Sequence, residues 1–457
     1  MRVAIVGVTC VVVVGVLVVA ARGPRAAAKA PGAAAGAPAS PGATAPAASP
    51  PPAAAAVPPP VALRDRGIFA DLDAGVRIAA PRWIDRRTTW VLVDKQARVL
   101  TLYAGGDAVK SYPIALGFDP VRDKEREGDG RTPEGDFFIT EALDRNLQAK
   151  YGARSLRLSY PNAEDAARGR RQKLVTAAQA EAIVAAVRAG RQPPQATPLG
   201  GSIRIHGGGV GRDWTAGCVA LRDADVSELY RFVGVSTRVR VLAARHPRLA
   251  DDRDGDGIPD LADVALGAKK TALNAAAYTD GYFRMAYPGG DVPRGKGVCT
   301  DVIVRALRNA GFDLQALQHQ DVLARRRAYP WITRPDANID HRRVKNLAVY
   351  FGRHFRARSV ALDAATLKDW LPGDVVLLDT FESKPGPDHI GIVSDTLGAS
   401  GLPLVVNNWT VGSRTGEMDL LSFVPVTHRF RVPATANVPE HSGAGGPGSG
   451  RREEARP

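Results

Sequence analysis

The sequence predicts a multidomain protein in which a mostly β domain with helical insertions is followed by an α+β domain. Its 457 residues are enough for two or three domains that each bury a core. Short apolar runs typical of strands dominate residues 88–245, whereas helical stripes and strands alternate over residues 271–433. An acidic stretch at residues 246–270 separates the two regions.

The N-terminal residues 1–22 predict export. Val3 to Ala21 form a run without a charged residue, bounded by arginines. Such a run is longer than most signal-peptide cores and barely long enough to span a bilayer, so a cleaved signal peptide and a membrane anchor both remain open. Residues 23–62 are rich in alanine and proline and predict an extended tether, followed by a lead-in segment at 63–87. The tail at 434–457 predicts disorder.

Charge and cysteine content narrow the function. The formal net charge is +14 and the sequence pI ≈ 9.9. No zinc, helix-turn-helix or aromatic-interleaved basic motif accompanies this charge, so an anionic cell envelope fits an exported chain better than nucleic acid does. Beyond Cys10 in the leading apolar run, only Cys218 and Cys299 remain. Two lone cysteines in an exported chain indicate reactive thiols and argue against a disulfide framework.

Within residues 88–245, several local signals define elements. Strands at 90–93 and 99–103 flank a turn and predict a hairpin. Thr176 and Gln179 form a capping box that opens a helix ending before Gly190. A strand at 237–242 closes the domain.

This domain contains a candidate nucleophile and base. A strand at 202–205 leads into His206 and a glycine cluster, and Cys218 follows twelve residues after the histidine. A catalytic thiol needs a base within hydrogen-bond reach and donors for a developing oxyanion, here the amides of Gly217 and Cys218. Arg204 and Thr215 are candidate substrate contacts. The alternative is a buried cysteine beside a loop histidine.

Three motifs carry a family resemblance. They are WTAGCVAL at 214–221, GDGRTPEGD at 128–136 and Tyr-Pro-Asn at 160–162. Together they resemble the L,D-transpeptidase (YkuD-type) catalytic domain over roughly 88–243. The resemblance implies acyl transfer on peptidoglycan stem peptides through a thioester. Ala216 and Ala220 stand where many members carry histidine and arginine, so cross-linking and hydrolysis both remain open.

The acidic stretch has the spacing of a calcium loop. Counting from residue 252, carboxylates fall at positions 1, 3, 5, 9 and 12, with glycine at 6. This spacing resembles EF-hand, dockerin and thrombospondin-repeat loops and predicts a structural Ca²⁺; an acidic solvated linker is the alternative. No cofactor is expected for catalysis. The candidate ligands are Asp252, Asp254, Asp256, Asp260 and Asp263.

A second candidate site lies within residues 271–433. Cys299 opens a predicted helix, where the helix dipole favours a thiolate. His389 begins a predicted strand, and a further strand at 403–406 ends in Asn407 and Asn408. A cysteine on a helix, a histidine on a strand and a third polar residue make a papain-like arrangement.

The second region is similar to NlpC/P60-type cysteine peptidases, and closest to an uncharacterised relative of them. The resemblance rests on GVCTDV at 297–302, RPDANIDHRRVKNL at 334–347 and HIGIVSD at 389–395. It implies that Cys299 is the nucleophile and His389 the base, that Asn407 or Asn408 orients the histidine, and that Tyr287 contributes to the oxyanion hole. His341, Arg342 and Arg343 are either structural or substrate-facing.

These observations predict an exported enzyme of the cell envelope that remodels peptidoglycan. Cys218 and His206 would make or release bonds to stem peptides, and Cys299 and His389 would hydrolyse peptide or amide bonds in the same polymer. The expected partners are stem peptides, a cell-wall-attached protein as acceptor, and the membrane if the N-terminal segment is uncleaved. The alternative is a peptidoglycan-binding scaffold that has lost chemistry in one or both domains.

Overall fold

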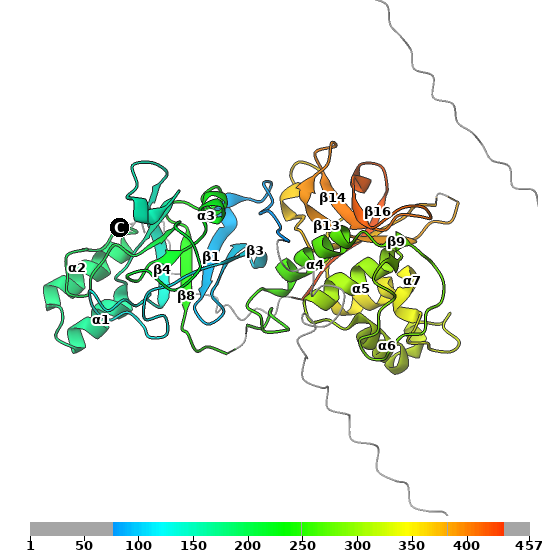
Figure 1. Ribbon diagram of the computed structural model, residues 1–457, viewed down its shortest axis with the longest axis horizontal. Coiled ribbons are helices and arrows are strands. Elements are labelled where there is room, and N and C mark those ends of the chain that lie inside the picture. Colours follow the sequence, from blue (N-terminus) through cyan, green and yellow to red (C-terminus); the bar gives the residue numbers. More distant parts are fainter. Residues whose placement is uncertain (1–75, 248, 382, 434–457) are drawn as a thin grey trace, which may run out of the picture. The chain divides into compact units, whose positions relative to one another are not determined.

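The computed structural model describes residues 76–247, 249–381 and 383–433 (Figure 1). The predicted export segment, tether and tail lie outside these residues. Among the described residues, no helix is both long and apolar enough to cross a membrane. Two large sheets form, one in each half of the chain.

The first domain is built on an eight-stranded sheet with the order β3-β2-β1-β8-β4-β5-β6-β7. The mostly β prediction is therefore confirmed, as is the predicted hairpin, which β1 and β2 form in antiparallel register. The parallel β1–β8 pair closes the domain as expected. The strands are β1 Thr89–Asp94, β2 Val99–Ala104, β3 Asp107–Pro113, β4 Gly135–Leu143, β5 Ser155–Leu158, β6 Arg204–His206, β7 Val219–Ala220 and β8 Arg238–Leu242.

Helices are inserted between strands of this sheet. α1 (Ala163–Arg171) and α2 (Ala177–Arg188) pack on each other between β5 and β6, and α3 (Asp223–Leu229) follows β7. The predicted capping box of Thr176 and Gln179 is confirmed, since each side chain accepts the other residue's backbone N–H.

The second domain combines a six-stranded sheet, order β11-β16-β12-β13-β14-β15, with helices. Its first helix, α4 (Asp260–Asn274), begins inside the stretch predicted as a linker and packs extensively on α5. The elements are β9 Ala277–Tyr278, β10 Lys296–Gly297, α5 Cys299–Asn309, α6 Leu314–Ala324, η5 Asp340–Arg342, α7 Val344–His354, β11 Arg356–Arg358, β12 Val375–Leu378, β13 His389–Leu397, β14 Pro403–Asn407, β15 Gly416–Met418 and β16 Val426–Arg431.

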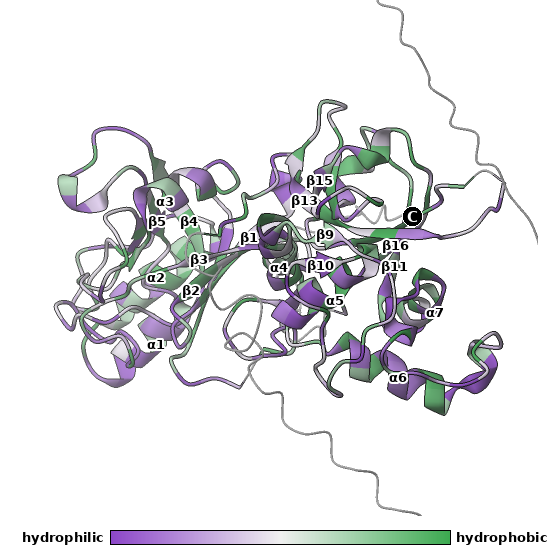
Figure 2. Ribbon diagram, turned by 45° about the vertical axis from the view of Figure 1, so that its right-hand side comes forward, coloured by the Kyte–Doolittle hydropathy of each residue, from purple (hydrophilic) through white to green (hydrophobic). Residues whose placement is uncertain are grey.

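Burial explains why these helices form where they do. Hydrophilic and hydrophobic residues alternate along α6 and α7 (Figure 2), as expected of helices with one face on a core. α5 differs, because all of its residues are buried, including charged ones. The central strand β12 is also buried along its whole length. The Cys299-bearing helix and the strands around His389 therefore lie in the interior of the second domain.

Candidate active sites

Strand register brings His206 and Cys218 onto neighbouring strands. β6 and β7 run parallel, with Ile205 opposite Val219 and His206 opposite Ala220. Cys218 directly precedes β7, so it lies level with Arg204, two residues from the histidine. Residues two apart along a strand share a face, so the thiol and the imidazole lie on the same side of the sheet. The strand register thus brings the two residues to neighbouring positions, while the hydrogen-bond partner of the Cys218 sulfur is the Ser202 carbonyl oxygen at 3.8 Å.

His206 is held tightly. Its Nδ1 lies 2.6 Å from the carbonyl oxygen of Gly207, which assigns the proton to Nδ1 and leaves Nε2 as a proton acceptor. The imidazole is 2 % exposed. The rings of Tyr151 and Trp214 meet it edge to face, at centroid distances of 5.0 and 5.7 Å. These two aromatic contacts were not predicted, because both come from loops whose positions depend on the tertiary fold.

Burial shifts both groups toward their neutral forms. It lowers the pKa of His206 to about 4, and the charges of Arg204 and Lys150 lower it further. Burial also raises the pKa of the Cys218 thiol, opposed by the Arg204 backbone amide and by the charges of Arg204, Lys150 and Lys124. At neutral pH the resting pair is therefore a thiol beside a neutral imidazole, which is the proton-acceptor form of the base.

Thr215 and Gly217 shape the turn that carries Cys218. The Thr215 hydroxyl donates to the Cys218 carbonyl oxygen at 2.7 Å and accepts the Gly217 N–H at 3.1 Å. Thr215 is buried, so it holds the turn together and does not face a substrate. The Gly217 amide, predicted as an oxyanion donor, is engaged by this hydroxyl. Gly217 has a φ of +129°, and a Cβ there would lie 2.5 Å from the Arg131 carbonyl oxygen.

The GDGRTPEGD motif packs against the turn that carries Cys218. Gly117 bridges to Thr215, and the Gly117 N–H donates to the Thr132 hydroxyl at 3.0 Å. Asp129 organises the loop by accepting three backbone N–H groups and pairing with Lys124 at 2.8 Å. The motif thus fixes the backbone that surrounds the nucleophile.

Arg204 and Ala220 have buried positions next to the pair. Arg204 is 5 % exposed and donates to Glu141 at 2.6 Å and to the Ser155 hydroxyl at 3.0 Å. These contacts occupy the guanidinium that was predicted to bind substrate. Ala220 is fully buried beside His206, so an arginine there would not fit without rearrangement.

The second domain brings its three predicted residues to one place. Cys299 is the first residue of α5, and His389 is the first residue of β13. His389 Nε2 lies 3.3 Å from Asn407 Oδ1, at the end of β14, and Trp409 meets the imidazole edge to face at 4.7 Å. Asn408 has a different role, since its amide donates to two backbone carbonyls. Of the two asparagines, Asn407 is therefore the one that contacts His389.

The Cys299 thiol is deeply buried. Burial raises its pKa to about 12, with Asp301 adding to the shift and the backbone of Ile390, next to His389, opposing it. Burial also lowers the pKa of His389. As in the first domain, burial favours a neutral thiol and a neutral imidazole. The backbone contact with Ile390 places the Cys299 thiol, at the start of α5, next to the first residues of β13.

The tyrosine beside Cys299 differs from the predicted one. Tyr287 is 47 % exposed and packs edge to face on His319 of α6, at 5.4 Å. Tyr278, on β9, lies close enough to Cys299 for the thiolate charge to raise the tyrosine pKa, after the larger effect of burial. The sequence signal for Tyr287 was its position before two glycines, and it did not indicate proximity to the thiol.

Part of the stretch at 334–347 supports the start of α5. Arg342 pairs with Asp301 at 2.8 and 3.0 Å and donates to the Gly281 carbonyl oxygen at 2.8 Å. Asp301 in turn accepts the Val298 N–H at 2.7 Å, which fixes the start of α5. His341 is buried at 1 % exposure, whereas Arg343 is exposed. Of the two predicted roles, structural or substrate-facing, the structural role fits the buried His341 and Arg342.

Three of the five predicted calcium ligands converge. Carboxylate oxygens of Asp252, Asp254 and Asp256 lie within 4.8 Å of one another. Asp260 instead accepts the Arg253 N–H at 2.7 Å, and Asp263 accepts the Asn309 amide at 2.7 Å. The loop therefore brings the carboxylates of positions 1, 3 and 5 together, where they also accept backbone N–H groups of the loop, and those of positions 9 and 12 lie outside this cluster.

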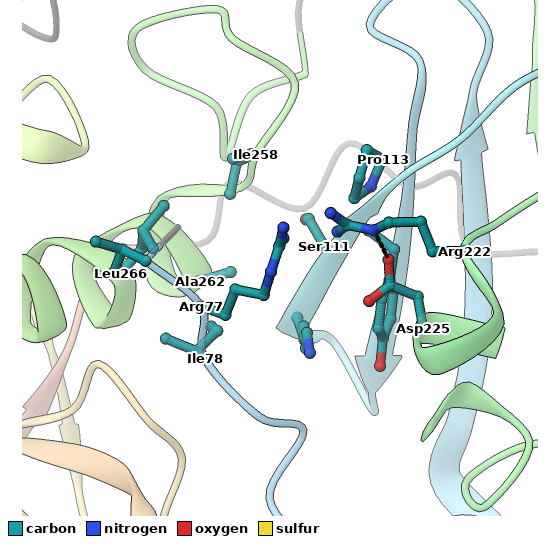
Figure 3. A pocket seen from close by; sticks show the side chains of 12 residues that line it. Arg77, Ile78, Ser111, Pro113, Arg222, Asp225, Ile258, Ala262 and Leu266 are labelled. Carbon is teal, nitrogen blue, oxygen red and sulfur yellow. Dashed lines mark hydrogen bonds and ion pairs between the residues drawn. The ribbon is translucent and has the colours of Figure 1, made fainter. Parts of the chain in front are cut away.

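The described residues also form a pocket of about 160 Å³ (Figure 3). Its lining includes Arg77, Pro113 and the Arg222–Asp225 pair, whose Nε and Oδ2 atoms are 2.6 Å apart. No cysteine or histidine lines it, so it lacks the groups that either predicted reaction needs.

The first site contains a cysteine and a buried histidine, and the comparisons with known proteins match both halves of the chain to domain families. Residues 88–241 match the L,D-transpeptidase catalytic domain, and residues 265–432 match a domain of unknown function, DUF1287. The uncharacterized protein YijF of Escherichia coli (strain K12) is 41% identical over 161 residues, which cover 35% of this chain and 75% of YijF. The chain belongs to the same family as YijF.

Solved structures show weaker similarity. Bdellovibrio bacteriovorus Bd1075 is 21% identical over 36% of this chain and 51% of its own, with a TM-score of 0.24. An L,D-transpeptidase from Mycobacterium smegmatis is 12% identical over 34% and 59%, with a TM-score of 0.20. The helical cell shape determining protein Pgp2 from Campylobacter jejuni is 12% identical over 70% and 91%, with a TM-score of 0.25. The chain spans less than two thirds of the first two, and scores this low carry no weight for its function.

Proposed function

We propose that the protein is an exported peptidoglycan-remodelling enzyme whose first domain transfers acyl groups through Cys218. The observation that supports this most is the orientation of His206, whose Nδ1–H is bound by the Gly207 carbonyl so that Nε2 can accept the thiol proton. The expected place of action is the cell envelope, with the N-terminal segment as signal or anchor.

In this mechanism Nε2 takes the Cys218 proton while the sulfur attacks a stem-peptide carbonyl carbon. Because the Gly217 amide donates to Thr215, the Cys218 amide is the predicted donor that would stabilise the tetrahedral oxyanion. Collapse breaks the C–N bond, the imidazolium gives its proton to the leaving amine, and a thioester remains on Cys218. An amine, from a second stem peptide or a wall-attached protein, or water then takes the acyl group, giving a cross-link, an attachment or release.

The test uses a carbapenem, whose β-lactam carbonyl should acylate the same thiol. The match of residues 88–241 to the L,D-transpeptidase catalytic domain makes this inhibitor class a suitable probe. Intact-mass spectrometry of the full-length protein should show a single imipenem adduct. The Cys218→Ala variant should lose it, and Cys299→Ala should retain it. An adduct that persists in Cys218→Ala would contradict the proposal.

We further propose that the second domain hydrolyses peptide or amide bonds in the same polymer. Cys299 would be the nucleophile, His389 the base and Asn407 the residue that orients the imidazole, as their contacts support. The NlpC/P60-like, papain-type assignment belongs to this proposal. The burial of Cys299 means that a substrate must enter a narrow site or displace a covering segment.

The second candidate function is that of a scaffold that binds peptidoglycan without chemistry. Ala216 and Ala220, which replace residues common in the family, favour it for the first domain. A thiol whose reactivity does not depend on His206 would support the scaffold, because an activated nucleophile needs its base.

We also propose that the loop at 252–256 binds a structural Ca²⁺. The three converging carboxylates fit a hard cation that prefers oxygen ligands, while the engagement of Asp260 and Asp263 predicts weak binding. A ligand that binds only the folded state stabilises it by mass action. Millimolar Ca²⁺ should therefore raise the melting temperature of the full-length protein relative to EDTA.

The matched variant for this calcium prediction is Asp254→Ala combined with Asp256→Ala, which removes two of the three clustered ligands. It should abolish most of the Ca²⁺-dependent rise in melting temperature while Mg²⁺ has little effect on either protein. Identical melting curves for the unsubstituted protein in EDTA and in Ca²⁺ would show that the loop is only an acidic linker.

A further inference from the structure

Asp223 lies one peptide group away from the catalytic histidine. Its Oδ1 accepts the Gly208 N–H at 3.1 Å and the Ala153 N–H at 2.9 Å. The Gly207 carbonyl and the Gly208 N–H belong to the same peptide bond, and that carbonyl accepts His206 Nδ1–H at 2.6 Å. An unbroken chain of hydrogen bonds therefore connects the imidazole to a carboxylate through one planar amide.

Two glycines make room for this carboxylate. A Cβ added at Gly207 would lie 2.0 Å from Asp223 Oδ1, and one at Gly152 would lie 2.1 Å from it. The Gly207 N–H is itself fixed by the Tyr151 carbonyl at 2.9 Å. The glycines beside His206 thus do more than permit a turn, since they allow a carboxylate to approach the peptide that orients the base.

A peptide group polarised at one end becomes a stronger partner at the other. An N–H bound to an anion shifts electron density toward its carbonyl oxygen, and hydrogen bonds in a chain strengthen one another. A stronger carbonyl acceptor holds Nδ1–H more firmly and favours the imidazolium that forms when Nε2 takes the thiol proton. This is the role that a directly bound carboxylate has in other catalytic triads.

Among the charged groups that affect the pKa of His206, Asp223 is the anion that favours the protonated imidazole. Burial is the main cause that lowers the pKa of His206, and Arg204 and Lys150 act in the same direction. The Gly207 carbonyl and Asp223 oppose them. Near the thiol, the charged groups with an effect are Arg204, Lys150 and Lys124, all cationic.

We infer that Asp223 is a positioning residue for the acyl-transfer reaction: through the Gly207–Gly208 peptide it acts as the third member of a relayed Cys218–His206–carboxylate triad. This inference rests on the function proposed for the first domain. It assigns no contact between Asp223 and the substrate.

The test measures how fast iodoacetamide alkylates Cys218 in the full-length protein as a function of pH, with peptide-resolved mass spectrometry. Asp223→Asn keeps an oxygen acceptor for both amides and removes the charge. It should slow alkylation at pH 7 by roughly three- to tenfold and move the midpoint to higher pH, because the imidazolium that balances the thiolate loses its anion. Asp223→Ser, with a shorter oxygen acceptor, replaces it if the asparagine variant does not fold.

Asp225→Asn is the matched control. Asp225 lies on the same helix, but its carboxylate pairs with Arg222 at 2.6 Å and not with the peptide, so its loss should leave the profile unchanged. A carboxylate acting only through space on the thiol would give the opposite sign, since removing a nearby anion makes a thiolate easier to form.

His206→Ala in the same assay distinguishes a failure of the Asp223 inference from a failure of the proposed activation of Cys218 by His206. If it slows alkylation and Asp223→Asn does not, the relayed triad is wrong and the proposed function stands. If His206→Ala has no effect, the proposed activation of Cys218 fails, and the inference about Asp223 fails with it.

Discussion

Replacing His206 with alanine is expected to lower acyl transfer from a stem peptide to Cys218 by at least about a hundredfold, since a positioned general base contributes this much or more. Cys218→Ala should remove the activity altogether. The measurement is single-turnover formation of the acyl-enzyme from a synthetic stem peptide, followed by mass spectrometry of the full-length protein.

His246→Ala is a matched control for this loss. His246 Nδ1 lies 2.7 Å from the carbonyl oxygen of the next residue, Pro247, just as His206 bonds to Gly207. It shares this Nδ1 contact, while its Nε2 pairs with Asp94 at 3.0 Å. If His246→Ala slows acyl-enzyme formation as much as His206→Ala does, the loss reflects general damage and not removal of the base.

The pH profile gives an independent check of the same base. Burial lowers the pKa of His206 to about 4, so Nε2 is unprotonated above that pH and protonated below it. The kcat/KM of the wild type should therefore fall as the pH drops through about 4, and an ordinary histidine would give this fall near 6.5. A fall near 6.5 would show that the imidazole is more solvated in solution than its surroundings indicate.

Local signals in the sequence were sufficient for elements that depend on nearby residues. The hairpin, the Thr176 capping box and the position of Cys299 at the start of α5 all follow from a few adjacent side chains. The helix α4 was missed because the acidic loop before it led to a linker interpretation. Its buried residues Leu261, Val264, Ala265 and Ala268 have helical spacing, so the signal was present.

The parts of the sites that were not predicted depend on contacts between distant segments. The rings on either side of His206 come from separate loops, and the carboxylate of Asp223 reaches the glycine loop from α3. Tyr278 reaches Cys299 because β9 pairs with β10, whose residues lie nineteen positions further along the chain. The spacing of residues in one sequence does not show which distant segments come into contact. It does identify the residue types that each reaction needs.

The two thiols should make different products. Each cysteine has its own histidine, and each histidine has its own orienting acceptor: the Gly207 carbonyl for His206 and the Asn407 side chain for His389. Among the hydrogen bonds and ring contacts of the described residues, neither imidazole contacts the other site. Loss of an activated nucleophile costs several orders of magnitude, so single substitutions should separate the two activities cleanly.

We therefore expect Cys299→Ala to remove one set of cleaved stem peptides from purified wall and to leave the Cys218-dependent products intact, and Cys218→Ala to do the reverse. Liquid chromatography with mass spectrometry of the muropeptides, with both single variants and the double variant, makes the comparison. Tyr287→Phe is the control within the second domain, because that ring packs on His319 and is 47 % exposed, whereas Cys299 is buried. If Cys299→Ala and the wild type give the same muropeptides from several wall types, the second domain binds the wall without cleaving it. If either single variant removes every product, the two sites are not independent, because a substrate must then pass through both cysteines in sequence.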